Sequence, residues 1–430
     1  MSEVKKNEFK SEKVVETTCK HFVQRRKRFC RMTVARGQEY CGEHMNTIPE
    51  LSHISEENFK KRVPCPLDPK HTVYLWNLKK HLNICNARVK EMPSYIQTGR
   101  NLGEDDTNGS SSRCIKLSEI DEHLMNEIID KINKIYEEHV DGTIEEMICS
   151  HPVLNDELSK ESYGSKTLKH LTQTSSILGC LKQLDLLLPK TCFIEFGAGK
   201  GQVSFWLAEA MKDTEQSTVL LVDKASLRHK KDNKIEDRNS VQRIRADISD
   251  LDLEKLEAVQ LAENIVAVGK HLCGGATDVT LRCLINGNQI RKSVKGFVIA
   301  LCCHHRCTWR AFVGKKFLVD NGITQQEFDV LTKMVGWAVC GTGMSRQLRK
   351  EIEMRNEQKE TTTNVETTVT AKIPREEREK IGMKCKRILD YARIQFLHEN
   401  GFTTSLKYYV TSDVTLENVC LIGITSNNKI

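Results

Sequence analysis

Two compact sets of cysteine and histidine residues lie near the N-terminus of the chain, which has 430 residues. Groups of four thiolates and imidazoles bind Zn²⁺ tetrahedrally and leave no coordination position open for catalysis. The sequence therefore predicts two structural zinc ions, held by a Cys-Cys-Cys-His module at 17–46 and a Cys-His-His-Cys finger at 62–88. The predicted ligands are Cys19, Cys30, Cys41 and His44 in the module, and Cys65, His71, His81 and Cys85 in the finger.

The spacing within each set supports these ligands. Cys41 and His44 form a tight chelating pair, which favours His44 over its rival His21. His81 and Cys85 lie four residues apart, one turn of a helix, so they share a face. Segments this short cannot build a hydrophobic core, and metal binding would therefore supply their folding energy.

Positive charge is concentrated in the same N-terminal segment. Residues 1–100 carry 20 Lys and Arg against 11 Asp and Glu, whereas the rest of the chain carries 45 against 47. Basic residues interleaved with zinc ligands favour contacts with nucleic-acid phosphates, so we expect RNA as the partner. Zinc modules also bind proteins, and a basic tail can be merely solvated, so charge alone leaves these alternatives open.

A glycine-rich turn, EFGAGKG at 195–201, follows a short apolar run and leads into a helical pattern. Its glycines allow a tight turn and a close approach of a ligand to the backbone. Acidic residues at the ends of the next two strands can accept hydrogen bonds from ribose hydroxyls and an adenine amino group. This pattern favours S-adenosylmethionine over a nicotinamide cofactor, although either acid could be a plain strand-end cap. The predicted cofactor-binding residues are Glu195, Gly197, Gly199, Gly201, Asp223 and Asp247.

Two further strand ends carry polar clusters, GKHLCGGATD at 269–278 and CCHHRC at 302–307. Open α/β sheets bind ligands at the carboxyl ends of their strands, so both clusters should face the cofactor. Methyl transfer to a hydroxyl needs that hydroxyl to be aligned and its proton removed. The candidate bases or orienting groups are Lys270, His271, Asp278, His304 and His305.

Two alternatives remain open at the second cluster. One is a third metal site built on Cys302, Cys303, His304, His305 and Cys307. Neighbouring side chains on a strand end point in opposite directions, so we expect that only some of these five share a metal. The other alternative is a cysteine nucleophile, as in enzymes that methylate bases.

The elements that position these residues follow from the apolar pattern. From 191 to 430, short apolar runs alternate with helical segments, which indicates a parallel sheet of βαβ units closed by an antiparallel hairpin. A helical segment at 116–190 precedes it, and its first helix begins near Ser118 as N-cap. We interpret this helix as a packing helix rather than a coiled coil. A flexible linker is predicted at 97–115 and a flexible insertion at 355–372.

Composition excludes several classes of protein. No apolar run of about 18 residues exists, so no membrane span is expected, and the charged N-terminal segment lacks a secretory h-region. We expect an intracellular protein of the nucleus, the cytoplasm or both, in which the 17 cysteines stay reduced. The sequence leaves the oligomeric state open.

The zinc modules and the motifs EFGAGKGQ, GKHLCGGATD and CCHHRC together resemble the eukaryotic tRNA methyltransferases that 2'-O-methylate the fourth nucleotide of the acceptor stem. The resemblance implies a Rossmann-like class I methyltransferase domain of α/β fold with two small N-terminal zinc-finger modules. It also implies S-adenosylmethionine as cofactor, tRNAs of the proline, glycine and histidine type, and cytidine or adenosine as the methylated nucleotide. Rival functions are a non-catalytic RNA-binding or splicing module and a protein methyltransferase.

Overall fold

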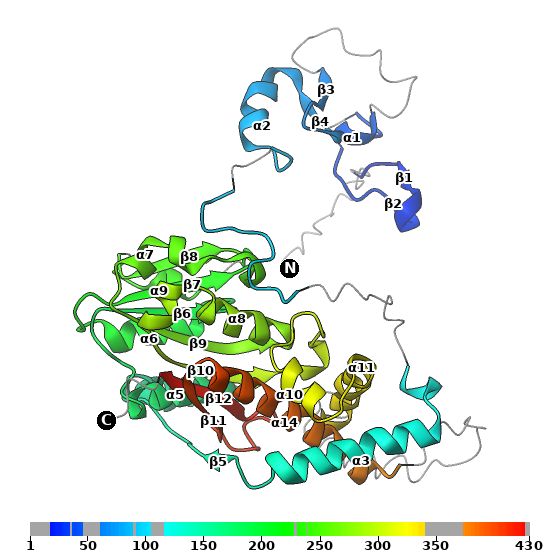
Figure 1. Ribbon diagram of the computed structural model, residues 1–430. Coiled ribbons are helices and arrows are strands. Elements are labelled where there is room, and N and C mark those ends of the chain that lie inside the picture. The colour runs from blue at the N-terminus through cyan, green and yellow to red at the C-terminus, as the bar shows by residue number, and fades with distance from the viewer. Residues whose placement is uncertain are drawn as a thin grey trace, which may run out of the picture. The chain divides into compact units, whose positions relative to one another are not determined.

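The computed structural model describes residues 18–34, 37–45, 61–88, 92–104, 116–227, 230–237, 239–339 and 373–425 (Figure 1). The chain divides into two compact units, Met1–Met92 and Pro93–Ile430. The predicted insertion at 355–372 lies outside the described residues. No helix in the described part of the chain has the length and apolar character needed to cross a bilayer.

An eight-stranded sheet forms the centre of the second unit, in the order β5-β11-β12-β10-β9-β6-β7-β8. Strands β6 to β10 are mutually parallel, whereas β12 runs antiparallel to both of its neighbours, β10 and β11. This arrangement confirms the predicted parallel sheet and its closing hairpin. The strands are β5 (Glu145–Glu146), β6 (Thr191–Phe196), β7 (Thr218–Asp223), β8 (Val241–Arg245), β9 (Asn264–Cys273), β10 (Val294–Cys302), β11 (Phe402–Tyr408) and β12 (Val419–Thr425).

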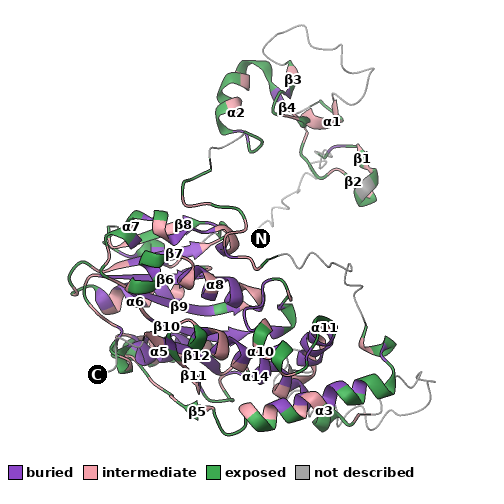
Figure 2. Ribbon diagram, viewed as in Figure 1, coloured by how far each residue is buried: buried purple, intermediate pink, exposed green. Residues whose placement is uncertain are grey.

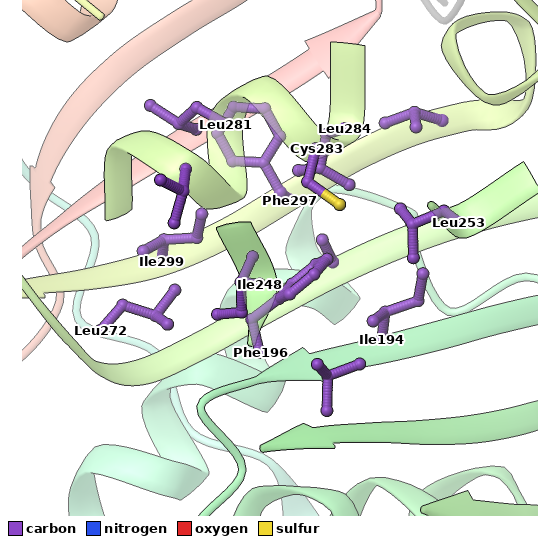
Figure 3. Packing of buried hydrophobic residues seen from close by; sticks show 14 of the residues in the cluster. Ile194, Phe196, Ile248, Leu253, Leu272, Leu281, Cys283, Leu284, Phe297 and Ile299 are labelled. Carbon is purple, nitrogen blue, oxygen red and sulfur yellow. The ribbon is translucent and has the colours of Figure 1, made fainter. Parts of the chain in front are cut away.

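Helices cover both faces of the sheet, as its nearly continuous apolar strands require. On one face, α8 (Gly275–Ile285) packs its Leu281 among Phe196, Leu272 and Phe297 (Figure 3). On the other face, α5 (Ser165–Gln183) and α6 (Gln202–Met211) share a second cluster. The central strands are therefore drawn mostly as buried in Figure 2.

A third apolar cluster joins four helices beside the sheet: α3 (Glu122–His139), α10 (Lys315–Asp320), α11 (Gln325–Met334) and α14 (Arg375–Glu399). Helix α3 presents Met125, Ile128 and Ile132 to this cluster, and is thus a packing helix within the domain. Its N-cap is Asp121, whose carboxylate accepts a hydrogen bond from the Leu124 amide. The prediction of Ser118 as N-cap is therefore wrong, because a short 3-10 turn at Leu117–Glu119 precedes the helix.

The prediction of a flexible linker at 97–115 is wrong for its first residues. The Gln97 amide donates to the carbonyl of Asp250, and the buried Asn101 side chain donates to the carbonyls of Ile248 and Leu251. Residues 97–102 thus lie on the domain, whereas 105–115 fall outside the described residues. The helical segment at 116–190 also belongs to this unit, because it supplies β5 at the sheet edge and α5 on one face.

The first unit contains two small elements built around the cysteine and histidine sets. One has the hairpin β1 (Phe22–Val23) and β2 (Arg28–Phe29), followed by the short helix α1 (Gly42–Met45). The other has the hairpin β3 (Arg62–Cys65) and β4 (Asp68–Tyr74), followed by α2 (Leu78–Ile84). A carboxylate joins them: Glu43 lies 2.6 Å from Arg62 and accepts a hydrogen bond from the Thr72 amide.

Candidate functional site

The strand order places a ligand site at the carboxyl ends of β6 and β9. From β6 the chain proceeds outward to β7 and β8, then crosses back to β9 and β10 on the other side of β6. Open α/β sheets bind ligands at such a switch point. The glycine turn at 197–201 follows β6, and the polar segment at 270–275 spans the end of β9, so both lie at this point.

The glycine turn has a backbone that other residues rarely adopt. Gly197, Gly199 and Gly201 all have positive φ, at 64°, 53° and 71°. A side chain at Gly201 would lie 2.6 Å from Asp232, so glycine is required there for packing as well. At Gly199, by contrast, an added Cβ would have no neighbour closer than 3.9 Å. The backbone at Gly199 is therefore open to a ligand, which fits the predicted role of this turn.

Asp223 and Asp247 both hold local backbone at the same sheet edge. Asp223 accepts hydrogen bonds from the amides of Gly199 at 2.7 Å and Ala225 at 2.7 Å. Asp247 caps a 3-10 turn through the Ser249 amide, and Lys224 lies 2.6 Å from its other oxygen. This lysine and the amide hold the pKa of Asp247 below its usual range, against the effect of burial. Each carboxylate keeps further lone pairs for ribose or adenine donors.

Glu195 is buried and contacts the helix that follows the glycine turn. Its carboxylate accepts hydrogen bonds from both the amide and the hydroxyl of Ser204, in the first turn of α6. Burial raises its pKa to about 7, although these hydrogen bonds and the nearby Lys270 and Arg243 favour the charged form. The geometry thus gives Glu195 a positioning contact with α6.

Lys270 is the best-placed candidate base. It lies in β9, three residues before the last residue of that strand. Its ammonium donates to the His170 carbonyl and the Thr174 hydroxyl, both at 3.2 Å. Burial lowers its pKa to about 8, while the charge of Glu195 opposes this shift. A buried lysine with a pKa near the working pH suits proton transfer.

Helix α5 supplies site residues that the sequence analysis missed. His170 and Thr174 contact Lys270, and the His170 ring lies edge-on to that of His271, with 5.7 Å between centroids. The sequence signal for these residues was the run of four polar residues Gln173–Ser176 within a helical segment. The structure shows that all four are buried. Such a run indicates that a helix faces polar groups, but not which ones.

His271 follows Lys270 and is exposed at the same sheet edge. Partial loss of hydration, with the positive charge of Lys270 beside it, lowers the pKa of His271. Its imidazole is therefore neutral at neutral pH. A neutral, exposed imidazole can accept a hydrogen bond from a substrate, so His271 remains a candidate orienting group.

Asp278 and His304 form ion pairs within a buried network of charged side chains. Arg393 in α14 lies 2.8 Å and 3.0 Å from the two carboxylate oxygens of Asp278. His304 Nε2 lies 2.5 Å from Asp390, whose pKa falls to about 2 despite burial, because of His304, Arg387 and Arg393. Asp278 and His304 are therefore each held by a charged partner within the protein, so of the five candidate bases or orienting groups we place Lys270 and His271 first.

The last cluster is split by the 3-10 turn at His304–Arg306. His305 is exposed, and Cys307 is buried against Arg393, whose guanidinium lies 3.1 Å from its sulfur. Cys302 and Cys303 instead join Cys273 of β9, with the three sulfurs within 4.8 Å of one another. Of the five residues offered as an alternative metal site, the structure thus brings only Cys302 and Cys303 into this group, together with Cys273.

The eight predicted zinc ligands are assembled as two groups of four, each with ligand atoms within 4.8 Å of one another. In the module, His44 Nδ1 lies 3.4 Å from the Cys19 sulfur and 3.3 Å from that of Cys41. His21 stacks on His44 with 3.9 Å between ring centroids, so it supports the ligand ring. In the finger, the Cys65 and Cys85 sulfurs are 3.7 Å apart.

The outer surface of the finger combines basic and aromatic side chains. Tyr74 and Trp76 are exposed, and their rings stack on each other. Lys70, Lys79 and Lys80 are exposed on the same finger. Stacking rings among cations form a surface suited to nucleic acid.

Comparisons with known families agree with this geometry along most of the chain. The family described as Methyltransferase TRM13 matches residues 172–424. The family described as CCCH zinc finger in TRM13 protein matches 17–45, and the family described as U11-48K-like CHHC zinc finger matches 62–86.

Relatives align over nearly their whole length. The proteins called tRNA:m(4)X modification enzyme TRM13 homolog in Mus musculus and Homo sapiens are each 36% identical, covering 96% of this chain and 95% and 96% of the relatives. The Saccharomyces cerevisiae protein called tRNA:m(4)X modification enzyme TRM13 is 30% identical, covering 94% of this chain and 95% of its own length. The assembled zinc groups, the glycine turn and these matches lead to one conclusion: the chain belongs to the TRM13 methyltransferase family.

Proposed function

We propose that this protein transfers a methyl group from S-adenosylmethionine to the 2'-hydroxyl of the fourth nucleotide in a tRNA acceptor stem. The observation that carries the proposal is the agreement, over at least 94% of the chain, with proteins called tRNA:m(4)X modification enzymes. That agreement includes both zinc modules as well as the methyltransferase domain. We infer an intracellular location from the same relatives, since tRNA is modified inside cells.

The residues at the sheet edge fit the proposed cofactor. Space beside Gly199 lets a ligand reach the backbone, and the carboxylates of Asp223 and Asp247 lie on neighbouring strand ends. S-adenosylmethionine would supply an activated methyl group at this edge. Lys270 and His271, on the adjacent strand β9, are the groups we place nearest the acceptor hydroxyl.

The protein residues have two tasks in this reaction. Lys270 in its neutral form would take the hydroxyl proton onto Nζ, while His271 would orient the ribose. The basic faces of the zinc elements would bind duplex phosphates through charge. An A-form stem displays its 2'-hydroxyls in a wide, shallow groove, so no base needs to leave the stack.

A methylation assay with defined tRNA tests this proposal. Purified protein, labelled S-adenosylmethionine and an acceptor-stem substrate should yield one ribose methyl, located by mass spectrometry of nuclease digests. The matched substrate carries 2'-deoxyribose at nucleotide 4 only, and should accept no label because the acceptor oxygen is gone. Label on the base, or label in histones and none in tRNA, would contradict the proposal.

A Gly199→Trp variant provides the matched enzyme. The indole would fill the open space at the turn, so we expect affinity for S-adenosylmethionine to fall at least about a hundredfold, with the zinc content unchanged. If this variant bound S-adenosylmethionine as tightly as the wild type, the glycine turn would not be part of the cofactor site, and the proposal would be contradicted.

A further inference from the structure

Three thiols from two strand ends meet at the edge of the sheet that carries the candidate site. Cys273 ends β9 and Cys302 ends β10, and Cys303 follows directly. The sulfurs of Cys273 and Cys302 are 3.9 Å apart, and all three sulfurs lie within 4.8 Å of one another. In the described part of the chain, only this group and the two zinc-finger groups bring three or more such ligands together.

The backbone at Cys303 is what makes the group possible. Two adjacent residues in a strand direct their side chains to opposite faces, which argues against a shared metal. Cys303, however, has φ of 52° and ψ of 40°, in the left-handed region that residues other than glycine rarely adopt. This conformation turns its thiol toward that of Cys302. Such outliers concentrate at ligand sites, where the surroundings hold them in place.

The spacing of the sulfurs matches a zinc site rather than a disulfide. A tetrahedral Zn²⁺ with Zn–S bonds of about 2.3 Å separates its sulfurs by about 3.8 Å. The two sulfurs of the finger that matches a zinc-finger family are 3.7 Å apart, and Cys273 and Cys302 are 3.9 Å apart. A disulfide would require about 2.05 Å.

We propose that Cys273, Cys302 and Cys303 bind a third zinc ion. Three thiolates leave the fourth position open for a water molecule or another oxygen or nitrogen ligand, as in zinc sites that are not purely structural. Three thiolates and Zn²⁺ carry a net charge of −1, and Arg306 places its guanidinium beside Cys273. This ion would join the ends of β9 and β10, and so hold the segment that contains Lys270 and His271.

The loops around the thiols are already fixed to one another. The Gly274 amide donates to the Cys302 carbonyl at 3.2 Å. Gly274 has φ of 54°, and an added Cβ would lie 2.6 Å from the backbone of Arg306. The two strand ends therefore present their thiols from a fixed backbone, which is the preorganisation that a metal site needs.

Zinc content of the full-length protein tests the proposal without any variant. After exhaustive dialysis, elemental analysis should give three zinc ions per chain. A Cys41→Ser, Cys65→Ser double variant, which loses a ligand from each finger, should keep one. A count of two in the wild type, or of zero in the double variant, overturns the third site; so does a Cys273–Cys302 disulfide found by peptide mapping of freshly purified protein.

A matched pair of single variants assigns the site. Cys302→Ala should lower the count from three to two, whereas Cys192→Ala, a buried thiol on the neighbouring strand β6, should leave three. If Cys302→Ala does not fold, the half-buried Cys303→Ala takes its place. Cobalt substitution gives an independent measurement: thiolate-to-cobalt absorption should persist in the double finger variant. Its disappearance there, or an unchanged count of three in both Cys302→Ala and Cys303→Ala, would contradict the proposal.

Discussion

At the residue scale, Lys270 and Glu195 are two buried groups whose pKa values shift in opposite directions. Burial lowers the pKa of the lysine to about 8 and raises that of the glutamate to about 7. Each charge partly offsets the shift of the other. Environments that move two titratable groups away from their usual values are typical of sites where protons move.

The pH dependence of methyl transfer should report Lys270. Only the neutral amine accepts a proton, so we expect kcat/KM to rise about tenfold per pH unit below pH 8 and to level off above it. Neighbouring charges that set this midpoint are Glu195 on β6 and Lys231. Lys270→Met should abolish the rising limb and lower kcat by about a hundredfold or more, with cofactor affinity retained. A flat profile in the wild type would remove Lys270 from proton transfer.

Glu195 should make stability fall as pH rises. Its pKa is about 7 in the folded protein and near 4.5 when unfolded, so between these values the folded state binds more protons. Stability that is present below pH 4.5 is thus lost as pH rises toward 7, by on the order of 3 kcal/mol for such a shift. Glu195→Gln should flatten this slope in denaturant titrations at pH 5 and 7, and an unchanged slope would contradict the assignment.

The cofactor turn was predictable from sequence, whereas the surroundings of Lys270 were not. Glycines before a helix and acids after successive strands have short-range patterns, and the structure places Gly199 against Asp223 as those patterns suggest. Thr174 lies about a hundred residues before Lys270, and no periodicity links the two. The φ of Cys303 is set by tertiary packing, so a strand pattern gave the wrong side-chain direction for that residue.

At the element scale, helix α14 is joined to α8 through buried charge. Arg393 pairs with Asp278 of α8, and Arg387 and Arg393 both pair with Asp390 of α14 itself. Asp390 in turn binds His304 in the turn after β10. One helix from the C-terminal part of the chain thereby fixes the segments that follow both β9 and β10.

Removing one member of this network should be costly. Asp278→Ala removes one of the two carboxylates that pair with the buried Arg393 guanidinium, so we expect a loss of about 3 kcal/mol in the free energy of unfolding. The exposed Asp320→Ala should change it by less than about 0.5 kcal/mol. Chemical denaturation of both variants measures the difference, and similar losses would show that the network contributes little.

At the scale of the whole molecule, substrate binding and chemistry are assigned to separate units. Met1–Met92 carries the zinc groups and the excess of positive charge, and Pro93–Ile430 carries the sheet and its ligand edge. If the two units fold independently, a variant that unfolds one zinc element should weaken tRNA binding without changing cofactor binding. The sequence showed this division through composition, while the packing of 97–102 and of α5 onto the sheet emerged only in three dimensions.

A Cys65→Ser variant tests that independence. Loss of one ligand should unfold the finger, weaken tRNA binding about tenfold or more and reduce its salt dependence, because phosphate contacts are lost. Cofactor affinity, measured by calorimetry, should match the wild type. A parallel loss of cofactor affinity would mean that the two units depend on each other for folding.

The bridge from Glu43 to Arg62 and Thr72 has a kinetic consequence for tRNA capture. If the two zinc elements moved independently, each would lose orientational entropy separately when it bound the tRNA. Joined by the Glu43 carboxylate, they would dock as one body, so the first phosphate contact would raise the effective concentration of the second. Residence time on the stem would then depend on Glu43, the acidic side chain that bridges the two zinc elements.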